Sequence, residues 1–402
     1  MLSDNAIDNL VQPIVDRQES INMYVILKMA DRLKAVRELS RRDVEKLRTL
    51  AVTGADVREI NKELAKQSGL QERDIKSLIR TVGADTYKDT KPFYDYRHKS
   101  YIPFEKNKKM QRIVSGIANQ TRDTYKNISN SSATGFVIRD RDNPLRTHFY
   151  KIEDTYRRII DEAIQASLTG LVSSDTAINW AIKQLLNSGI RRISWDSGYT
   201  QRLDTAVRRN VLEGVRLVKQ AINDEAGKDF DADGKELSAH MNSAPDHEPF
   251  QGHIFTNAEW NKIQTCNDFE DVNGQKFSGV DRIIGVWNCK HVATSIVIAK
   301  HKPKYTPEQL QKFIDDNAKG YTAPDGKHMT LYQCTQKQRR METRIRYAKE
   351  EQMAMKELGN KTGKILARQK VIQFTNDYKA FSKDCGLPTK IKRCGVSGYT
   401  AY

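Results

Sequence analysis

Apolar residues recur every three or four positions through much of this chain, which is the period of an amphipathic α-helix. The pattern is most regular between residues 331 and 355, where six of eight such positions are apolar or small. These positions are Leu331, Cys334, Gln338, Met341, Ile345, Ala348, Gln352 and Met355. The spacing predicts a helix over residues 331–358, about 42 Å long at a rise of about 1.5 Å per residue. It also predicts a seam for a second helix, either in the same chain or in another copy of it.

A second apolar stripe predicts a buried helix in the middle of the chain. It begins at Leu203 and continues at spacings of four, four, four and three through Val207, Val211, Val215 and Val218. Two shorter helices are expected before it, one that stops at Gly170 and one that runs from Ser174 to a stop at Gly189. A further helix is expected over residues 365–381.

The first ninety residues predict short helices in an antiparallel bundle. Pro13 lies in the first of them, and we expect it to kink that helix or to shift its start. Residues 40–43 open a second helix, which Gly54 ends. Gly69 is expected to end a third helix, and residues 71–82 to form a fourth.

The middle of the chain mixes aromatic-rich loops with short strands. Residues 91–145 interleave aromatic and basic side chains, which is typical of a loop that docks its rings onto a core or of a nucleic-acid stacking platform. We favour docking because no strand-borne stacking motif accompanies the rings. Residues 136–139 predict a short strand, and residues 279–287 and 293–299 predict two more.

These elements predict a mainly α protein with a small α+β central domain, an elongated helical architecture and a long C-terminal helix. Composition agrees, because only 38% of residues are hydrophobic, 29% are charged and the mean hydropathy is −0.69. Such values are typical of long helices with much solvated or partner-covered surface. We divide the chain into an N-terminal helical bundle, an aromatic and basic connecting region, a helical region, a central α+β domain and a basic C-terminal helical region. The proposed boundaries are 1–90, 91–145, 146–225, 226–302 and 303–402.

Two features of composition bear on the compartment. No apolar run is long enough to cross a bilayer, so we expect no membrane partner. The five cysteines are an odd number scattered along a long chain. This usage indicates reduced thiols in a cytoplasmic setting.

Positive charge is concentrated near the C-terminus. The chain carries a net charge of +16, and residues 327–394 hold 17 Lys and Arg against 6 Asp and Glu, a net of +11. Such density attracts polyanions without reading their sequence, and packaged DNA is one candidate partner. The candidate phosphate contacts lie outside the seam positions: Arg339, Arg340, Arg344, Arg346 and Lys349. A solvated helix face, or a dock for an acidic protein, is the alternative interpretation.

Histidine and cysteine are concentrated in two short segments. Four of the eight histidines and one of the five cysteines lie within residues 238–255 and 287–291. Imidazole and thiolate are zinc ligands, and two short ligand pairs brought together by a fold form the usual structural site. The candidate ligands of a Zn²⁺ ion are His240, His247, Cys289 and His291. Their spacing is unlike the common zinc patterns, and a loop held by hydrogen-bonded histidines remains the alternative.

The same segments contain the ingredients of an enzyme. Cys289 with a neighbouring histidine has the composition of a thiol nucleophile and its base. Glu248 beside a metal-activated water would instead define a metal-dependent hydrolase. Neither arrangement carries a fuller catalytic motif, so no catalytic residue is assigned. Residues 229–234 open like a calcium loop, but His240 stands where the bidentate glutamate belongs, and the run therefore predicts a turn.

The His and Cys segments also carry a family resemblance. Its residues are Ser238, His240, Pro245, Asp246, His247, Phe250, Gln251 and Gly252, followed by Asn288, Cys289 and His291. In this order they resemble the middle of tailed-phage minor capsid proteins, the minor capsid protein 2 group, which is related to the head-morphogenesis F protein of phage Mu. Residues 194–215, 305–310 and 331–346 extend the resemblance over most of the chain.

The resemblance implies a phage minor capsid (head) protein at the portal vertex that acts in head morphogenesis or in DNA packaging and delivery. Its partners would be the portal and major capsid proteins, with packaged DNA as a further contact. Its location would be the virion, in the capsid interior or at the portal vertex, after assembly in the host cytoplasm. Two alternatives remain open on the residues alone: a metal-dependent hydrolase that uses the His and Cys cluster, and a sequence-independent nucleic-acid-binding protein.

Overall fold

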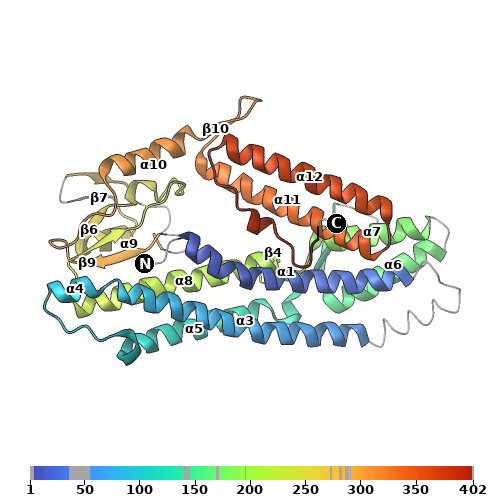
Figure 1. The fold of residues 1–402 in the computed structure, drawn as a ribbon, viewed down its shortest axis with the longest axis horizontal. Helices are drawn as coiled ribbons and strands as arrows, with labels where there is room; N and C mark the ends of the chain where they lie inside the picture. Colours follow the sequence, from blue (N-terminus) through green and yellow to red (C-terminus); the bar gives the residue numbers. More distant parts are fainter. Residues whose placement is uncertain are drawn as a thin grey trace.

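The computed structural model describes residues 4–35, 55–139, 143, 145–168, 172–194, 196–271, 274–279, 283–285, 289 and 291–400. Over these ranges the protein is mainly α, with an elongated array of long helices and a small α+β part (Figure 1). The expected fold class is therefore confirmed. The helix expected between residue 40 and Gly54, and the stop expected at Gly170, lie outside the described residues. The five proposed region boundaries stay a prediction.

The long helices α1 (Asp4–Ala35), α3 (Ala55–Lys88), α5 (Lys108–Ile128) and α8 (Leu203–Asp229) form a bundle. α8 packs against each of the other three. Its apolar stripe from Leu203 to Val218 is buried in the main core, as the spacing predicted. Pro13 lies inside α1 rather than at its start.

The expected break at Gly69 is wrong, because α3 continues through that position. A glycine in a helix interior costs roughly 1 kcal/mol relative to alanine, which is too little to end a helix held by other contacts. The residues that follow Gly69 are buried against the bundle core: Ile75, Leu78, Ile79 and Val82. Tertiary packing therefore decides the length of α3.

α5 had no counterpart among the elements expected from the sequence. Its buried positions are Met110, Val114, Ala118, Thr121, Tyr125 and Ile128. They repeat at three-to-four-residue spacing, and Asn107 caps the first turn by accepting a hydrogen bond of 3.1 Å from the backbone N–H of Met110. This periodicity and the cap are the signals that could have identified the helix.

The aromatic residues before α5 dock onto the bundle, which confirms the interpretation favoured from the sequence. Tyr94, on the short helix α4 (Lys91–Tyr96), is 2% exposed. The ring of Phe93 stacks on Phe230 with centroids 5.3 Å apart. Tyr101 stacks on Tyr87 in the same way, at 5.0 Å. A one-turn helix, η2 (Phe104–Lys106), then leads into α5.

A four-stranded antiparallel sheet, with the order β2-β1-β3-β4, lies beside the end of the bundle at which α8 begins. It comprises β1 (Thr134–Arg139), β2 (Thr147–Lys151), β3 (Arg191–Ile193) and β4 (Thr200–Arg202), and η3 (Ser131–Ala133) precedes it. β1 confirms the predicted strand. The other three strands were not expected, because none of them has a buried alternating face. β3 and β4 have only three residues each, and β2 is mostly exposed. Helices α6 (Ile152–Leu168) and α7 (Ser174–Ser188) connect β2 to β3, and Gly189 ends α7 at φ 57° as predicted.

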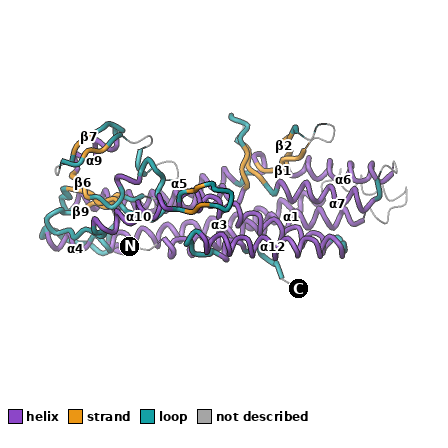
Figure 2. Tube along the Cα trace, turned by 90° about the horizontal axis from the view of Figure 1, so that it is seen from above, coloured by secondary structure: helices purple, strands orange, loops and turns teal. Residues whose placement is uncertain are grey.

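The α+β part is central in sequence but lies at one end of the molecule (Figures 1 and 2). Its sheet has the antiparallel order β6-β5-β9. The elements are β5 (Gly234–Leu237), η4 (Glu248–Phe250), β6 (Ile254–Thr256), α9 (Asn257–Gln264), the hairpin β7 (Phe269–Glu270) and β8 (Lys276–Phe277), and β9 (Ala293–Ile296). β9 confirms one predicted strand. The strand expected over residues 279–287 is wrong in its described part, since Ile284 and Gly285 lie in a turn.

The C-terminal region packs back on the bundle. It contains α10 (Pro307–Lys319), β10 (Tyr321–Thr322), β11 (His328–Met329), α11 (Leu331–Glu357), α12 (Lys361–Asp384) and η5 (Ile391–Cys394). The two predicted helices are confirmed in α11 and α12, which pack together as the C-terminal hairpin. The seam of α11 is filled within the chain, by α12 on one side and by α1 and α7 on the other. Among the described helices, none combines the length and apolar character needed to cross a membrane.

Candidate functional site

The His and Cys cluster sits where two segments are pinned by the small sheet. Residues 238–253 connect β5 to β6, and His291 lies just before β9. Ser238 ties the segments together: its N–H donates to the carbonyl of Val292 at 3.0 Å, and its Oγ accepts from the N–H of Val292 at 3.0 Å. Within the loop, Gln251 Oε1 accepts a hydrogen bond from the N–H of His240 at 3.0 Å. The sheet therefore holds the two ligand-bearing segments together.

Three of the four predicted ligands converge on one point. His247 Nδ1 lies 3.4 Å from Cys289 Sγ, and His291 Nδ1 lies 3.3 Å from the same sulfur. The three ligand atoms lie within 4.8 Å of one another, and all three residues are buried. Exposed fractions of 1% for His247, 8% for Cys289 and 2% for His291 show that bulk water has little access to them.

The fourth predicted residue, His240, adjoins this trio. Its ring lies edge-on to the His291 ring, with centroids 4.2 Å apart. The far nitrogens of the other two histidines meet polar side chains. Asp246 Oδ2 lies 3.4 Å from His247 Nε2, and Ser243 Oγ lies 3.4 Å from His291 Nε2. Both rings thus have their Nδ1 atoms turned to the sulfur and their Nε2 atoms held from behind.

The cluster also stabilises the thiolate form of the cysteine. Burial raises the pKa of the Cys289 thiol. The hydrogen bond with His247 and the backbone N–H groups of Gly285 and His291 lower that pKa by more than burial raises it. The net pKa lies below the ordinary value, because these donors outweigh the loss of hydration. Cys289 also belongs to a buried apolar cluster that contains four phenylalanines: Phe250, Phe255, Phe269 and Phe277.

The predicted phosphate contacts divide into two groups. Arg339, Arg340 and Arg344 are exposed on α11 and line a shallow hollow together with Gln336 and Thr343. Arg344 also lies over the Phe374 ring, with its guanidinium carbon 4.3 Å from the ring centre. The two remaining predicted contacts make internal interactions instead.

Arg346 has an exposed fraction of 13% and pairs with Glu19 at 2.9 Å and with Asp204 at 3.6 Å. Lys349 Nζ donates to the carbonyl of Cys394 at 2.7 Å and lies over the Tyr399 ring. Both side chains are committed to contacts within the protein. Sequence spacing did not reveal this, because their partners lie on α1, at the start of α8 and near the C-terminus.

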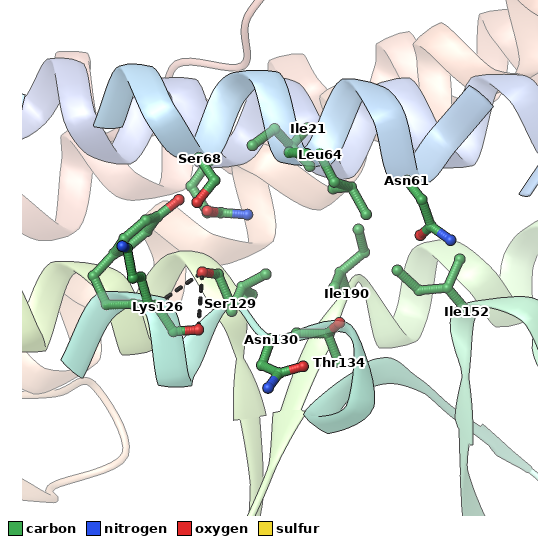
Figure 3. A pocket seen from close by; sticks show the side chains of 14 residues that line it. Ile21, Asn61, Leu64, Ser68, Lys126, Ser129, Asn130, Thr134, Ile152 and Ile190 are labelled. Atoms are coloured by element: carbon green, nitrogen blue, oxygen red, sulfur yellow. Dashed lines mark hydrogen bonds between the residues drawn. The ribbon is translucent and has the colours of Figure 1, made fainter. Parts of the chain in front are cut away.

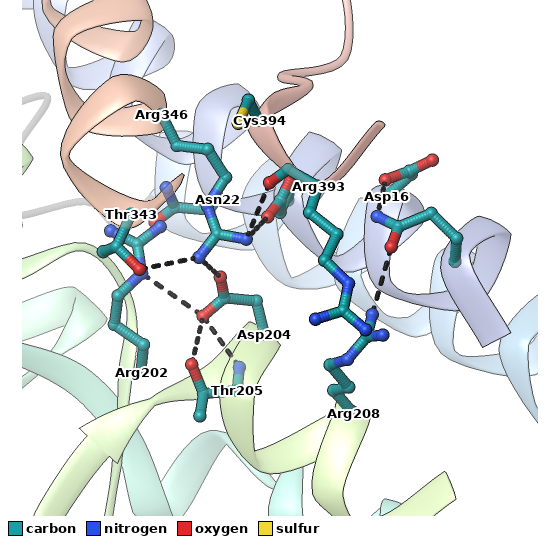
Figure 4. Close-up of polar contacts among 12 residues, drawn as sticks. Asp16, Asn22, Arg202, Asp204, Thr205, Arg208, Thr343, Arg346, Arg393 and Cys394 are labelled. Carbon is teal, nitrogen blue, oxygen red and sulfur yellow. Dashed lines mark hydrogen bonds and ion pairs between the residues drawn. The ribbon is translucent and has the colours of Figure 1, made fainter. Parts of the chain in front are cut away.

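Buried charges join these elements (Figure 4). Arg202 lies 3.2 Å from Asp204 and 3.0 Å from Glu350, and all three side chains are less than a tenth exposed. Asn22 on α1 donates to Glu350 at 3.1 Å. The network links α1, α8 and α11 through paired charges, so it holds the C-terminal hairpin against the bundle.

A cavity of about 390 Å³ opens between α1, α3 and the end of α5 (Figure 3). Its wall is a mixture of apolar side chains such as Ile21 and Leu64 with small polar ones such as Ser68 and Asn130. The one charged side chain among its described lining residues, Lys126, pairs with Glu72 at 3.2 Å. Its described lining residues include no His, Cys, Asp or Glu.

Over the described residues, the protein is a helical array with an α+β part at one end, and the buried His and Cys cluster lies in that part. A family model for phage minor capsid protein 2 matches residues 2–383. Because this match covers nearly the whole chain, the protein belongs to the phage minor capsid protein 2 family and is a component of the phage virion. Comparisons with curated proteins and with solved structures gave no match.

Proposed function

We propose that this head protein is assembled in few copies at the portal vertex and contacts DNA there through its C-terminal hairpin. The family match supports a role in the head. The observation that carries the proposal is the exposed arginine row of Arg339, Arg340 and Arg344 on α11, within a stretch of net charge +11. A cationic helix face binds the phosphate backbone of any DNA sequence by releasing its counterions.

Further positive charge lies beside this row. Lys390 and Arg393 near the C-terminus, and Arg208 on α8, all pair with the single carboxylate of Asp8. Burial and then the nearby Arg393 lower the pKa of Arg208, against the opposing effects of Asp8 and Glu342. An incoming phosphate would add negative charge beside these cations.

DNA binding is tested by replacing Arg339, Arg340 and Arg344 together with glutamine. Duplex affinity should fall at low salt, and the slope of log K against log salt should decrease by roughly 0.9 for each lost phosphate contact. Affinity should not depend on base sequence, because the contacts are to the backbone. Binding is measured by fluorescence anisotropy over a salt series.

The matched control removes three exposed cations from α3, with Arg73, Lys76 and Arg80 changed to glutamine. It lowers the net charge equally and should change affinity only slightly. The DNA contact is refuted if the intact protein fails to bind duplex DNA at low salt, or if both triple variants lose affinity equally.

Portal association is tested on particles. Purified virions should contain this chain at far fewer copies than the major capsid protein, and chemical cross-linking should join it to the portal protein. A copy number equal to that of the major capsid protein, or cross-links to the capsid shell alone, would contradict the portal location. Presence only in lysates and never in particles would favour a soluble enzyme built on the His and Cys cluster.

A further inference from the structure

We propose that His247 Nδ1, Cys289 Sγ and His291 Nδ1 bind one zinc ion, with His240 as the fourth ligand. The ion would fasten the 238–253 loop to the segment before β9. This inference is independent of the DNA contact and of the portal location, because it rests on the geometry of the α+β part alone.

The spacing of the three ligand atoms fits a zinc-sized centre. Zinc takes sulfur at about 2.3 Å and imidazole nitrogen at about 2.1 Å in a tetrahedron, which places sulfur and nitrogen about 3.6 Å apart. The two sulfur–nitrogen distances here are 3.4 Å and 3.3 Å. Both sulfur–nitrogen separations are therefore within a few tenths of an ångström of the value for zinc. Calcium and magnesium prefer oxygen ligands, so a thiolate with imidazoles selects zinc over them.

The surroundings match those of a zinc ligand set. A ligating histidine usually has its other ring nitrogen held by a carboxylate or another acceptor, which fixes the ring and its tautomer. Asp246 occupies that position behind His247, and Ser243 occupies it behind His291. Two Nδ1 atoms directed at the same sulfur are the arrangement that a shared metal centre requires.

Burial and the position of His240 favour a structural site over a catalytic one. A catalytic zinc keeps one position open to water, whereas a structural zinc is closed by four protein ligands. The trio is buried, and the His240 ring lies directly against His291. A rotation of His240 that brings a ring nitrogen to the centre would close the fourth position.

The first experiment measures metal in the purified full-length protein. Elemental analysis should give about one zinc per chain, and chelation should lower the melting temperature of the α+β part. Cys289→Ser should abolish binding, and His240→Ala should weaken it at least tenfold. Cys266→Ser makes the same chemical change at a half-buried cysteine outside the trio and should keep the zinc. His328→Ala is the matching control for His240→Ala, at an exposed histidine on β11, and should also keep the zinc.

A second measurement needs no variant, and so remains decisive if Cys289→Ser fails to fold. Cobalt substituted into the wild-type protein should show a thiolate-to-cobalt charge-transfer band with strong tetrahedral d–d absorption. Protein that contains no zinc and melts identically with and without chelator would overturn the proposal, as would a cobalt spectrum without the thiolate band. Full zinc affinity in His240→Ala would overturn the closed site and leave water in the fourth position.

Discussion

Glu19 illustrates how a single residue balances charge inside this protein. It is 2% exposed on α1, in a buried group where Arg202 and Arg346 meet the carboxylates of Glu19, Asp204 and Glu350. Burial raises the pKa of Glu19 to about 8, against the opposing effect of Arg346 and with further help from Asp204 and Glu350. Glu19 is therefore largely protonated at neutral pH, which leaves two arginines facing two carboxylates.

This raised pKa predicts a pH dependence of stability. The folded protein retains the Glu19 proton from the ordinary value of 4.5 up to about 8, whereas the unfolded chain has already released it. The stabilising contribution is thus complete below pH 4.5 and is lost as pH rises through about 8. Glu19→Gln mimics the protonated form. Between pH 5.5 and 8.5, wild type should lose at least about 1 kcal/mol of unfolding free energy relative to this variant.

Urea unfolding of both proteins at the two pH values checks this expectation. Glu351→Gln on α11 is a suitable control, since Glu351 pairs with the half-exposed Lys370. Parallel loss of stability in wild type and Glu19→Gln would show that another group carries the pH dependence.

At the scale of elements, the glycines in helix interiors separate local propensity from packing. A Cβ added at Gly69 on α3 meets nothing within 4 Å. A Cβ added at Gly214 on α8 would lie 2.4 Å from Thr121 Oγ1 and 2.7 Å from Thr121 Cγ2 on α5. Gly214 therefore permits the close approach of α8 to α5, whereas Gly69 has no such role among its described neighbours.

Alanine should consequently have opposite effects at the two positions. Gly69→Ala should stabilise the protein by about 0.5–1 kcal/mol, because it removes backbone freedom from the unfolded chain without a clash. Gly214→Ala should destabilise it by about 1–3 kcal/mol through overpacking between α8 and α5. Thermal unfolding of the two variants distinguishes them. A loss of stability in Gly69→Ala would contradict an unstrained position.

Helical period predicted α7, α8, α11 and α12, whereas α5 was missed although its buried positions repeat at the same spacing. α7 begins at Ser174 and is ended by Gly189, as predicted, with Ser173 as its N-cap. β3 and β4 left no such signal, since a three-residue strand is too brief to show alternation, and β2 left none because most of its residues are exposed. Their formation depends on strand pairing: β2 and β3 pair with β1, and β4 pairs with β3.

At the scale of the whole molecule, buried ion pairs attach the C-terminal hairpin to the bundle. Glu350 on α11 is fully buried and accepts hydrogen bonds from Arg202 and from Asn22. A second ion pair of the hairpin, Lys370 with Glu351, is half-exposed at Lys370 and joins α12 to α11 only. The first pair thus bears on assembly of the whole fold, and the second only on the hairpin.

Glu350→Ala should cost about 3–5 kcal/mol, because it leaves the Arg202 guanidinium buried with part of its counter-charge removed. Lys370→Ala should cost about 1 kcal/mol or less, since water screens an exposed pair. Hydrogen exchange should rise in α11 of Glu350→Ala while α3 and α5 stay protected. Equal stability of the two variants would show that the buried pair does not hold the hairpin.

The amino-acid sequence by itself determined the helical class, the apolar stripes, the basic C-terminal region and the set of four candidate ligands. These are local properties, because period, caps and composition act over a few residues. Tertiary structure alone decided that α3 passes through Gly69 and that the seam of α11 is filled within the chain. It also decided that Arg346 pairs with the buried Glu19 while Arg344 is exposed. The position of His247 beside Cys289 and His291 was likewise decided by the tertiary structure. Such outcomes depend on which charges and faces meet between segments far apart in the chain, and no local pattern encodes that pairing.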